Sequence, residues 1–315
     1  MVLYEELCDA HCHPHDDADN RALIPQLKTG HITLMGVRQD DWDTVAQVAK
    51  QCPNKKCIPA FGELKNMLRE KLSTYTSAFE DYTHDKDKEA HYDAVLTSMN
   101  ETEKSEIIKA LDPPFPRDEW YNNLKQHLET HPEAIVGEVG LDRAARLLPG
   151  GAIEWHGVKP TSVQCTIEHQ LQVFELQLQL AKELNRSMSV HCVQAQGHLL
   201  SLLQKHTKND PPIRLCLHSF GGSPGTLPQF MKLKGYTIYV SYSIAINERL
   251  GKKLDDLIQA VPTDRLLIES DLNTPKGQDE AMIAIAERVA KVHEWSVDQA
   301  IKQTHENWCK FIGIR

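Results

Sequence analysis

The sequence has 315 residues, of which 44 are acidic, 35 are basic and 16 are histidine, so its formal net charge is −9. A hydrophobic fraction of 41% with 25% charged residues excludes an intrinsically disordered chain. No apolar run reaches the ~18 residues of a membrane span, and the amino-terminal segment lacks the basic and apolar regions of a secretory signal. We therefore expect a folded intracellular protein, in the cytoplasm or the nucleus, without membrane association.

The eight cysteines stand singly, without the regular spacing of a secreted disulfide framework. This usage predicts a reducing compartment in which most thiols are buried as small apolar side chains. The acidic balance argues against sequence-independent attraction to a polyanion. It does not exclude a nucleic-acid substrate, because carboxylates that hold divalent cations count as negative charges until the cations bind. The excess of histidine is the first indication of metal or proton chemistry.

Short apolar, β-rich runs alternate with longer amphipathic stretches, which is the pattern of repeated β–α units. The predicted strands are Glu6–His13, His31–Val37, Cys57–Phe61, Ala134–Val139, Ser187–His191, Arg214–Ser219, Thr237–Ser241 and Leu266–Glu269. The predicted helices are Asp41–Gln51, Glu119–His131, Val163–Leu184, Gly197–Lys208, Thr226–Lys234, Glu248–Val261, Asp279–His293 and Val297–Ile312. Eight strands with intervening helices predict an α/β fold, a (β/α)8 TIM barrel that forms a single domain over residues 1–315.

One connection between predicted strands is far longer than the others. Residues 63–133 separate the third and fourth strands, whereas a βα loop usually has ~2–6 residues. The segment is dense in charge around Lys86-Asp87-Lys88-Glu89 and contains the proline-rich Asp112-Pro113-Pro114-Phe115-Pro116. Two interpretations stay open: a solvated helical insertion, or a lid over the mouth of the barrel, where variation among such barrels concentrates.

The first predicted strand ends in the motif Asp9-Ala10-His11-Cys12-His13-Pro14-His15. Because alternate residues of a strand share a face, we expect Asp9, His11 and His13 to project together, and Ala10 and Cys12 to point into the helical layer. Two neutral imidazoles at this spacing are suited to bind a metal ion. Cys12 is expected to be packed rather than ligating. We expect His15 to be exposed, because it follows the proline where the strand should end.

Four other predicted strands end in residues of the same chemical kinds. These are Glu138 and Asp142 after the fourth strand, His191 after the fifth, His218 after the sixth and Asp271 after the eighth. In a barrel, the carboxyl ends of all strands meet at one mouth. Each residue alone has a structural explanation, such as a histidine bonded to a backbone carbonyl or an aspartate that caps a helix. Together they predict a mixed nitrogen and oxygen site for two divalent cations.

The complete set of motifs resembles the TatD-type metal-dependent deoxyribonucleases, a family of amidohydrolase-like barrels, and resembles its fungal branch most. The resemblance runs through Asp9-Ala10-His11-Cys12-His13, Gly137-Glu138-Val139-Gly140-Leu141-Asp142, Val190-His191-Cys192, Leu217-His218-Ser219-Phe220-Gly221-Gly222 and Glu269-Ser270-Asp271. It covers nearly the whole chain apart from the long insertion. It implies a metal-dependent hydrolase that cleaves a phosphodiester, such as DNA, with water activated by two metal ions.

The resemblance also implies a role for each site residue. By that resemblance, His11 and His13 ligate one cation, Glu138 bridges two, His191 and His218 ligate the second, Asp271 binds metal and orients the attacking water, and Asp142 orients a ligand. Glu138 and Asp271 are therefore the expected catalytic residues, while Asp9 is expected to support the ligands. The residue types leave the identity of the two metals open among Zn, Mn, Mg and Co.

Two features common in this family are missing from the chain. The third strand is usually followed by Gly-x-His-Pro, where this sequence has Phe61-Gly62-Glu63-Leu64-Lys65-Asn66, and the fifth-strand motif usually continues with an arginine, where this sequence has His191-Cys192-Val193-Gln194-Ala195. Arg143 is the candidate phosphate partner, or else a solvated charge. The turn at Ser219-Phe220-Gly221-Gly222 either offers backbone N–H groups to an anion or simply reverses the chain tightly.

Three functions are compatible with these observations. The first is a phosphodiesterase that acts on DNA or another nucleic acid. The second, favoured by the missing histidine and arginine, is a hydrolase of small esters, amides or phosphoesters at the same site. The third is a protein that retains the barrel while residues 63–133 bind a protein partner.

Overall fold

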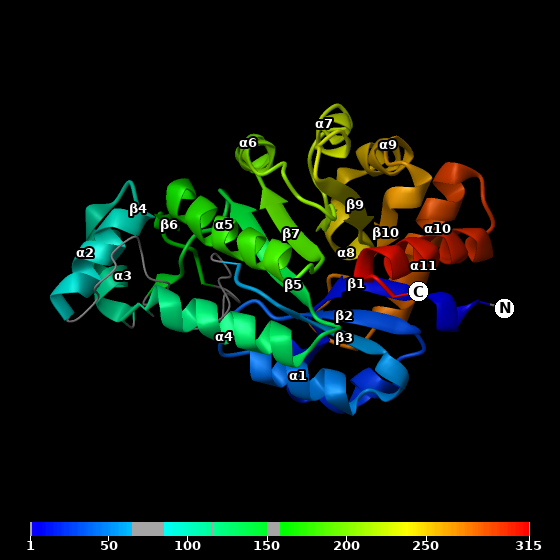
Figure 1. Ribbon diagram of the computed structural model, residues 1–315, viewed down its shortest axis with the longest axis horizontal. Helices are drawn as coiled ribbons and strands as arrows, with labels where there is room; N and C mark the ends of the chain where they lie inside the picture. The colour runs from blue at the N-terminus through cyan, green and yellow to red at the C-terminus, as the bar shows by residue number, and fades with distance from the viewer. Residues whose placement is uncertain (1, 65–84, 112, 115, 150–157, 315) are drawn as a thin grey trace.

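The structure, a computed structural model, describes residues 2–64, 85–111, 113–114, 116–149 and 158–314. Eight parallel strands form one sheet in the order β1-β2-β3-β5-β7-β8-β9-β10 (Figure 1). They are β1 (Cys8–Cys12), β2 (His31–Met35), β3 (Cys57–Phe61), β5 (Ile135–Asp142), β7 (Met188–Val193), β8 (Ile213–Leu217), β9 (Tyr236–Tyr242) and β10 (Leu266–Ile268). The first and last strands meet where Asp271 N donates to His11 O and His13 N donates to Leu272 O. The fold is the predicted (β/α)8 barrel.

Helices surround the sheet, and the apolar core lies on both faces of the strands. The helices of the barrel are α1 (Trp42–Gln51), α4 (Arg117–Thr130), α5 (Ile167–Glu183), α6 (Gln196–Lys205), α7 (Leu227–Met231), α8 (Ile244–Asn247), α9 (Lys252–Ala260), α10 (Gln278–His293) and α11 (Val297–Ile312). A large cluster, which includes Leu34, Val136 and Phe174, fills the space between strands and helices. A smaller cluster within the barrel joins Met35 to Trp308 of α11. Burial on both faces explains why the strands read as continuous apolar runs.

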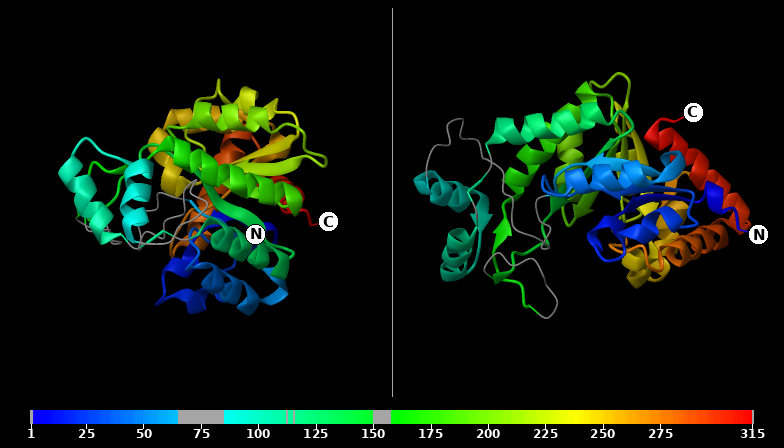
Figure 2. Two further views of the ribbon diagram at one scale, coloured as in Figure 1. Left: turned by 60° about the vertical axis from the view of Figure 1, so that its left-hand side comes forward. Right: turned by 90° about the horizontal axis from the view of Figure 1, so that it is seen from below.

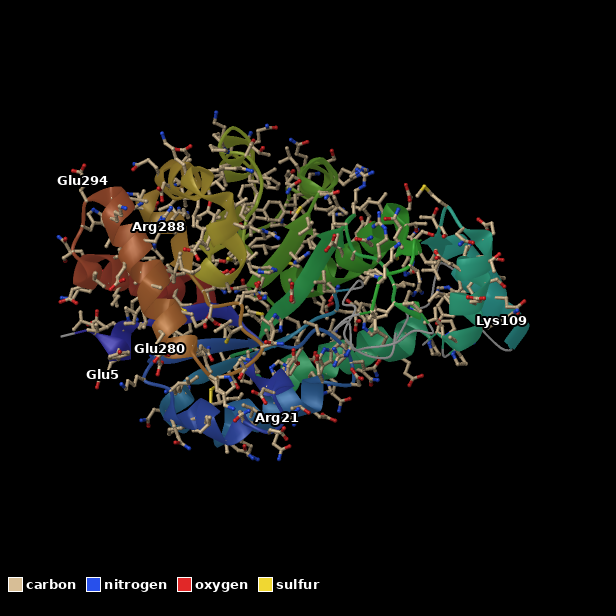
Figure 3. All side chains as sticks on the ribbon, turned by 180° about the vertical axis from the view of Figure 1, so that it is seen from behind. Glu5, Arg21, Lys109, Glu280, Arg288 and Glu294 are labelled. Carbon is tan, nitrogen blue, oxygen red and sulfur yellow. A yellow bond between two sulfur atoms is a disulfide. The ribbon has the colours of Figure 1, made fainter. Side chains whose placement is uncertain are left out.

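The long connection after β3 contributes to an arm at one end of the molecule. It contains α2 (Asp85–Val95), β4 (Leu96–Thr97) and α3 (Glu101–Ala110), and β4 pairs antiparallel with β6 (Gln164–Cys165), which follows β5. The arm lies opposite both termini (Figures 1 and 2), and Lys109 of α3 lies far from Glu5 (Figure 3). Residues 65–84 of the connection lie outside the described residues.

The arm has an apolar core of its own that combines two separate loops. Its members are Tyr92, Val95, Leu96, Ile107, Ile108, Leu111, Leu147 and Val163. The last two come from the connection after β5, and the others come from the connection after β3. The arm is therefore a joint product of two βα connections.

Several predicted helices have different bounds in the structure. The helix expected over Val163–Leu184 begins only at Ile167, because Gln164 and Cys165 pair with β4. The helix expected over Glu248–Val261 is interrupted at Gly251, whose φ of 56° ends a short 3-10 turn before α9 begins. A positive φ of this kind is typical of glycine, which lacks a Cβ. The helix expected over Thr226–Lys234 is reduced to the five residues of α7.

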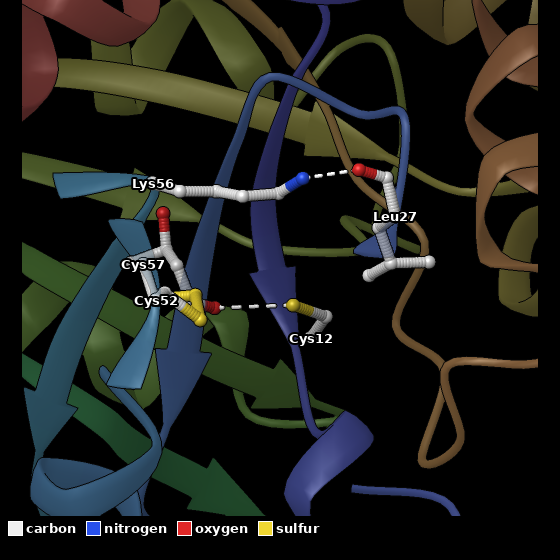
Figure 4. The surroundings of a disulfide bond; sticks show 6 residues. Cys12, Leu27, Cys52, Lys56 and Cys57 are labelled. Atoms are coloured by element: carbon white, nitrogen blue, oxygen red, sulfur yellow. Dashed lines mark hydrogen bonds between the residues drawn. A yellow bond between two sulfur atoms is a disulfide. The ribbon is translucent and has the colours of Figure 1, made fainter. Parts of the chain in front are cut away.

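The cysteines agree only partly with the sequence-based expectation. Cys52 and Cys57 form a disulfide between the end of α1 and the start of β3, close to Cys12 of β1 (Figure 4). Of the six free cysteines, all except Cys309 are buried. Cys12 donates from Sγ to the carbonyl oxygen of Thr33, so it is packed within the core as expected. Among the described residues, no helix combines the length and the apolar character needed to cross a membrane.

Candidate metal centre

The mouth of the barrel brings six of the predicted site residues together. His11 and His13 come from β1 and its end, Glu138 from β5, His191 from β7, His218 from the residue after β8 and Asp271 from the loop after β10. Their potential ligand atoms form three overlapping groups in which all atoms lie within 4.8 Å of one another. The groups are His11, His13 and Glu138; His11, His218 and Asp271; and Glu138, His191 and His218.

Glu138 lies at the centre of this cluster and divides its two oxygens between two histidine pairs. Its Oε2 atom lies 3.5 Å from His11 Nε2 and 3.3 Å from His13 Nε2. Its Oε1 atom lies 3.2 Å from His191 Nδ1 and 2.9 Å from His218 Nε2. One carboxylate thus faces both pairs, which is the geometry required of a bridging ligand.

Asp271 completes the pair on the side of His11. Its Oδ1 atom lies 3.7 Å from His11 Nε2 and 3.6 Å from His13 Nε2. The residue adopts a φ of 53°, and its backbone N–H donates to His11 O. This left-handed conformation is uncommon for a residue with a side chain, so the hydrogen bond to β1 helps to fix the carboxylate at the mouth.

On the ring nitrogen that faces away from Glu138, three of the four histidines have a hydrogen-bond partner, and that of His218 lies near a carboxylate. These outer contacts are His11 Nδ1 with Ser189 Oγ at 2.8 Å, His13 Nδ1 with Met35 O at 3.1 Å, His191 Nε2 with Asp142 Oδ2 at 3.1 Å, and His218 Nδ1 with Glu269 Oε1 at 3.7 Å. Partners of this kind set the tautomer and the orientation of metal-binding histidines. The inward nitrogens, which face Glu138 and one another, are therefore the ones placed to act as ligands.

Glu269 and Ser189 are site residues that the sequence-based interpretation did not identify. Glu269 is fully buried, accepts a hydrogen bond of 2.8 Å from Ser219 N, and also accepts from the hydroxyls of Ser219 and Ser241. The sequence does contain a signal for Glu269, because it lies two residues before Asp271 at the end of a predicted strand. Ser189 carries no comparable signal, since buried serines occur in many strands.

Asp9 does not project together with His11 and His13, contrary to the strand alternation. The register between β1 and β2 shifts between Asp9 and Cys12, so the side chains on either side of this irregularity change face. Ala10 consequently packs within the barrel and not in the helical layer. The Asp9 carboxylate accepts hydrogen bonds from Ser270 N at 3.0 Å and from Gln278 Nε2 at 2.9 Å. It thereby holds the chain just before Asp271.

His15 is buried, whereas the sequence predicted exposure. Its exposed fraction is 1%. Pro14 begins a short 3-10 turn, Pro14–Asp16, and this turn packs beside α1 instead of extending into solvent. Neither ring nitrogen has a hydrogen-bond partner among the described residues, although Nε2 lies 3.6 Å from Asp16 Oδ1. Burial lowers the pKa of His15 to about 4, so the ring is neutral.

The cluster strongly perturbs the protonation of its own members. Burial by itself lowers the pKa of His13 and of His191, but Glu138, together with Asp142 at His191, raises both to about 9. Burial by itself raises the pKa of Glu138, yet the neighbouring histidines hold it well below its ordinary value. Burial raises the pKa of Asp271 despite the attraction of His11. Such opposed shifts in one cleft are typical of functional sites.

Asp142 and Arg143 lie on the His191 side of the cluster. Asp142 Oδ1 accepts from Ala144 N at 2.6 Å and Ala145 N at 3.0 Å, while its other oxygen faces His191. Gln170 of α5 binds both the N–H and the carbonyl oxygen of Asp142, at 2.7 and 3.0 Å. Arg143 is exposed beyond the cluster.

The turn after β8 has its first two backbone N–H groups engaged within the protein. Ser219 N donates to Glu269 Oε1, and Phe220 N donates to Ser241 O at 3.3 Å. These two N–H groups are therefore not available to an anion. At the third strand, Leu64 stands where the family motif has its histidine, and the backbone of the preceding residue, Glu63, is held by Gln177 of α5. Lys65 and Asn66, which follow, lie outside the described residues.

The donor set fits divalent cations. The inward-facing atoms are imidazole nitrogens and carboxylate oxygens, which suit zinc, manganese and related ions. Close approach of so many lone pairs in a buried cleft is unfavourable unless protons or cations lie between them. The residues of the cluster therefore form a metal-binding site.

Comparisons with known proteins agree with this site. Residues 8–313 match the protein-family model described as TatD related DNase. The chain is 32% identical to the Cut9-interacting protein scn1 of Schizosaccharomyces pombe, over 98% of this chain and 99% of that protein. It is 26% identical to the uncharacterized deoxyribonuclease YMR262W of Saccharomyces cerevisiae, again over 98% and 99% of the two chains.

Solved structures share the architecture. The crystal structure of the TatD homologue YJJV from Escherichia coli superposes with a TM-score of 0.65 at 20% identity, covering 99% of this chain and all of that one. A TatD family hydrolase from Entamoeba histolytica superposes with a TM-score of 0.61 at 12% identity, covering 98% and 99%. At these identities, the likeness concerns the barrel fold alone.

Proposed function

The chain belongs to the TatD family of metal-dependent nucleases and hydrolases, and from this premise we propose that it hydrolyses phosphodiester bonds of DNA or another nucleic acid. The observation that carries the proposal is the position of Glu138 between two histidine pairs. Relatives whose names denote nucleases support the substrate class, among them the 3'-5' ssDNA/RNA exonuclease TatD of Erwinia amylovora, 28% identical over 47% of this chain.

We propose two divalent cations as cofactors, drawn from Zn, Mn, Mg and Co. His11, His13 and Asp271 would hold one, His191 and His218 the other, and Glu138 would contact both. When bound, the cations would supply an acidified water and positive charge opposite a phosphoryl oxygen.

The protein's own residues orient the reacting groups. Asp271 Oδ1 would accept a hydrogen bond from the attacking water and then its proton, because this carboxylate lies at the edge of the cluster where water can enter. Asp142 would keep His191 in one orientation through the Oδ2 contact. Arg143 is proposed as a partner for a substrate phosphate, since a guanidinium binds phosphate oxygens in pairs.

The test of this proposal uses purified protein loaded with each metal in turn and end-labelled DNA. We expect shortening of the DNA by the native protein and none by Asp271→Asn. Asp256→Asn, an exposed carboxylate on α9, serves as the matched control and should cut normally. Intact DNA at every concentration of every divalent metal would refute the proposal.

The second candidate is a hydrolase of small esters, amides or phosphoesters at the same site. It is favoured by Leu64, which stands where the family commonly has a phosphate-side His, and by the segment after His191, which lacks the Arg that is common there. Rapid turnover of small esters or amides with DNA left intact would favour this alternative over the first.

A binding role for the arm is compatible with either activity. The fission-yeast relative is named for an interaction with Cut9, and this motivates the proposal of a protein partner at residues 63–133. Charge reversal at the exposed residues Glu106 and Lys109 of α3 should then weaken binding to that partner without changing metal content. We further propose that residues 1–315 are one domain and that the protein acts in the cytoplasm or nucleus, where its free thiols would stay reduced.

A further inference from the structure

A hollow with a volume of about 450 Å³ lies beside the metal centre. We call it the arginine pocket, and define it by Thr97, Arg143, Arg146, Gln164, Thr166 and Gln194. Its walls come from the loops after β5 and β7, from the start of α5, and from the short β4–β6 sheet of the arm. The barrel and the arm thus build it together.

The pocket starts directly at the metal centre. Arg143 follows Asp142, whose Oδ2 contacts His191 Nε2 at 3.1 Å. The backbone N–H of Arg143 donates to Val193 O at 3.1 Å, so the loop after β5 is joined to the end of β7. Gln194 comes next in that second loop. A chain molecule that occupied the metal centre would therefore meet this pocket on the His191 side.

The pocket is positively charged within an acidic protein. Neither Arg143 nor Arg146 forms an ion pair with another residue in the described parts of the chain. Arg146 Nη1 donates to the carbonyl oxygens of Arg143 and Ala145, at 3.1 and 2.9 Å, which leaves most of its donors available. Glu168 is the acidic residue that lines the same hollow. Unpaired guanidinium groups beside a catalytic cleft are suited to bind phosphate oxygens.

We propose that the arginine pocket binds a backbone phosphate of the nucleic-acid strand outside the scissile bond. The inference rests on the proposed function and adds a specific binding site to it. It explains how a chain without the arginine after the fifth-strand motif can hold a polyanion: the positive charge comes from the neighbouring loop. Because Thr97 and Gln164 line the pocket, the arm limits which strands enter it.

The test measures binding separately from cleavage. Fluorescence anisotropy with single-stranded phosphorothioate DNA in Mg²⁺ compares the native protein with the double variant Arg143→Gln/Arg146→Gln. We expect the double variant to bind at least about tenfold more weakly at low salt. The slope of log K against log salt should fall by about 0.7 for each lost phosphate contact.

Arg265→Gln is the matched control, because Arg265 lies before β10 at the opposite end of the barrel. It should leave both the affinity and the salt slope unchanged. Thermal unfolding should show that the double variant remains folded at the temperature of the binding assay, since Arg143 is exposed and Arg146 is half-buried.

The outcomes separate the pocket from the activity. If the native protein cleaves DNA but the double variant binds it with native affinity and salt slope, the pocket proposal is wrong and the proposed function stands. If the native protein binds DNA through these arginines yet cleaves no phosphodiester, the pocket proposal stands and the proposed function is wrong. Equal loss of affinity in the Arg265→Gln control would also overturn the pocket, because the effect would then reflect net charge alone.

Discussion

Replacement of Gln170 by leucine tests how α5 supports the metal centre. Gln170 is buried, and its side-chain amide accepts from Asp142 N at 2.7 Å and donates to Asp142 O at 3.0 Å and to Cys165 O at 3.1 Å. Leucine keeps a similar volume but leaves three backbone groups without these partners. At a net ~1 kcal/mol for each hydrogen bond, the free energy of unfolding should fall by about 3 kcal/mol.

The same substitution should weaken metal binding on one side of the centre. Asp142 orients His191, and the loss of such an outer support typically reduces metal affinity by ~10–100-fold. Titration calorimetry of the metal-free protein should therefore reveal one weakened site. Urea unfolding followed by circular dichroism measures the change in stability.

Asn307→Leu provides the matched control. Asn307 of α11 is also fully buried, and its amide donates to Thr263 O at 2.7 Å and to Leu266 O at 2.8 Å, at the start of β10 and far from the mouth. It should cost a similar free energy of unfolding without a change in metal affinity. The reasoning is refuted if Gln170→Leu weakens metal binding no more than Asn307→Leu does.

Three further changes test other parts of the structure. Glu138→Gln removes the charge shared by both histidine pairs, so mass spectrometry after dialysis should find metal lost from both positions; full retention would contradict a bridging role. Gly140→Ala should lower the free energy of unfolding by at least about 2 kcal/mol in urea titrations, because φ is 152° and the new Cβ would overlap the carbonyl oxygen of His191; native-like stability would argue against this close approach. Burial raises the pKa of Asp41 from 3.8 to about 7, despite attraction by Arg38. The charged carboxylate therefore lowers the free energy of unfolding, and this loss is complete above pH 7. It disappears as the pH falls towards 4, where the carboxyl is protonated in both the folded and the unfolded state. Asp41→Asn should therefore gain stability relative to the native protein as the pH rises from 4 to 7, and parallel pH profiles would contradict the assignment.

The sequence was sufficient to predict the barrel and the six residues that meet at its mouth. Eight apolar runs with helical stretches between them have few alternatives to a closed parallel sheet. The chemistry of His11, His13, Glu138, His191 and the other candidates stands out because each ends a strand, and the fold brings those ends together.

The failed predictions involve features that depend on three-dimensional packing. A register shift within β1 turns the side chain of Asp9 towards α10, and no residue type in the motif predicts such a shift. His15 is buried because the chain after Pro14 packs beside α1, although a polar residue after a proline is usually solvated. The strand pairing of Leu96 with Cys165 was equally hidden, because two-residue strands carry no periodicity.

The shared core of the arm has a consequence for how this protein can change over evolutionary time. Tyr92 and Ile107 of this core precede α4 and β5 in the chain, and Leu147 and Val163 follow them. A deletion that shortened either connection would expose to solvent the apolar side chains of the other. The two segments are therefore expected to lengthen, shorten or disappear in step, and a homologue that lacks one should lack both.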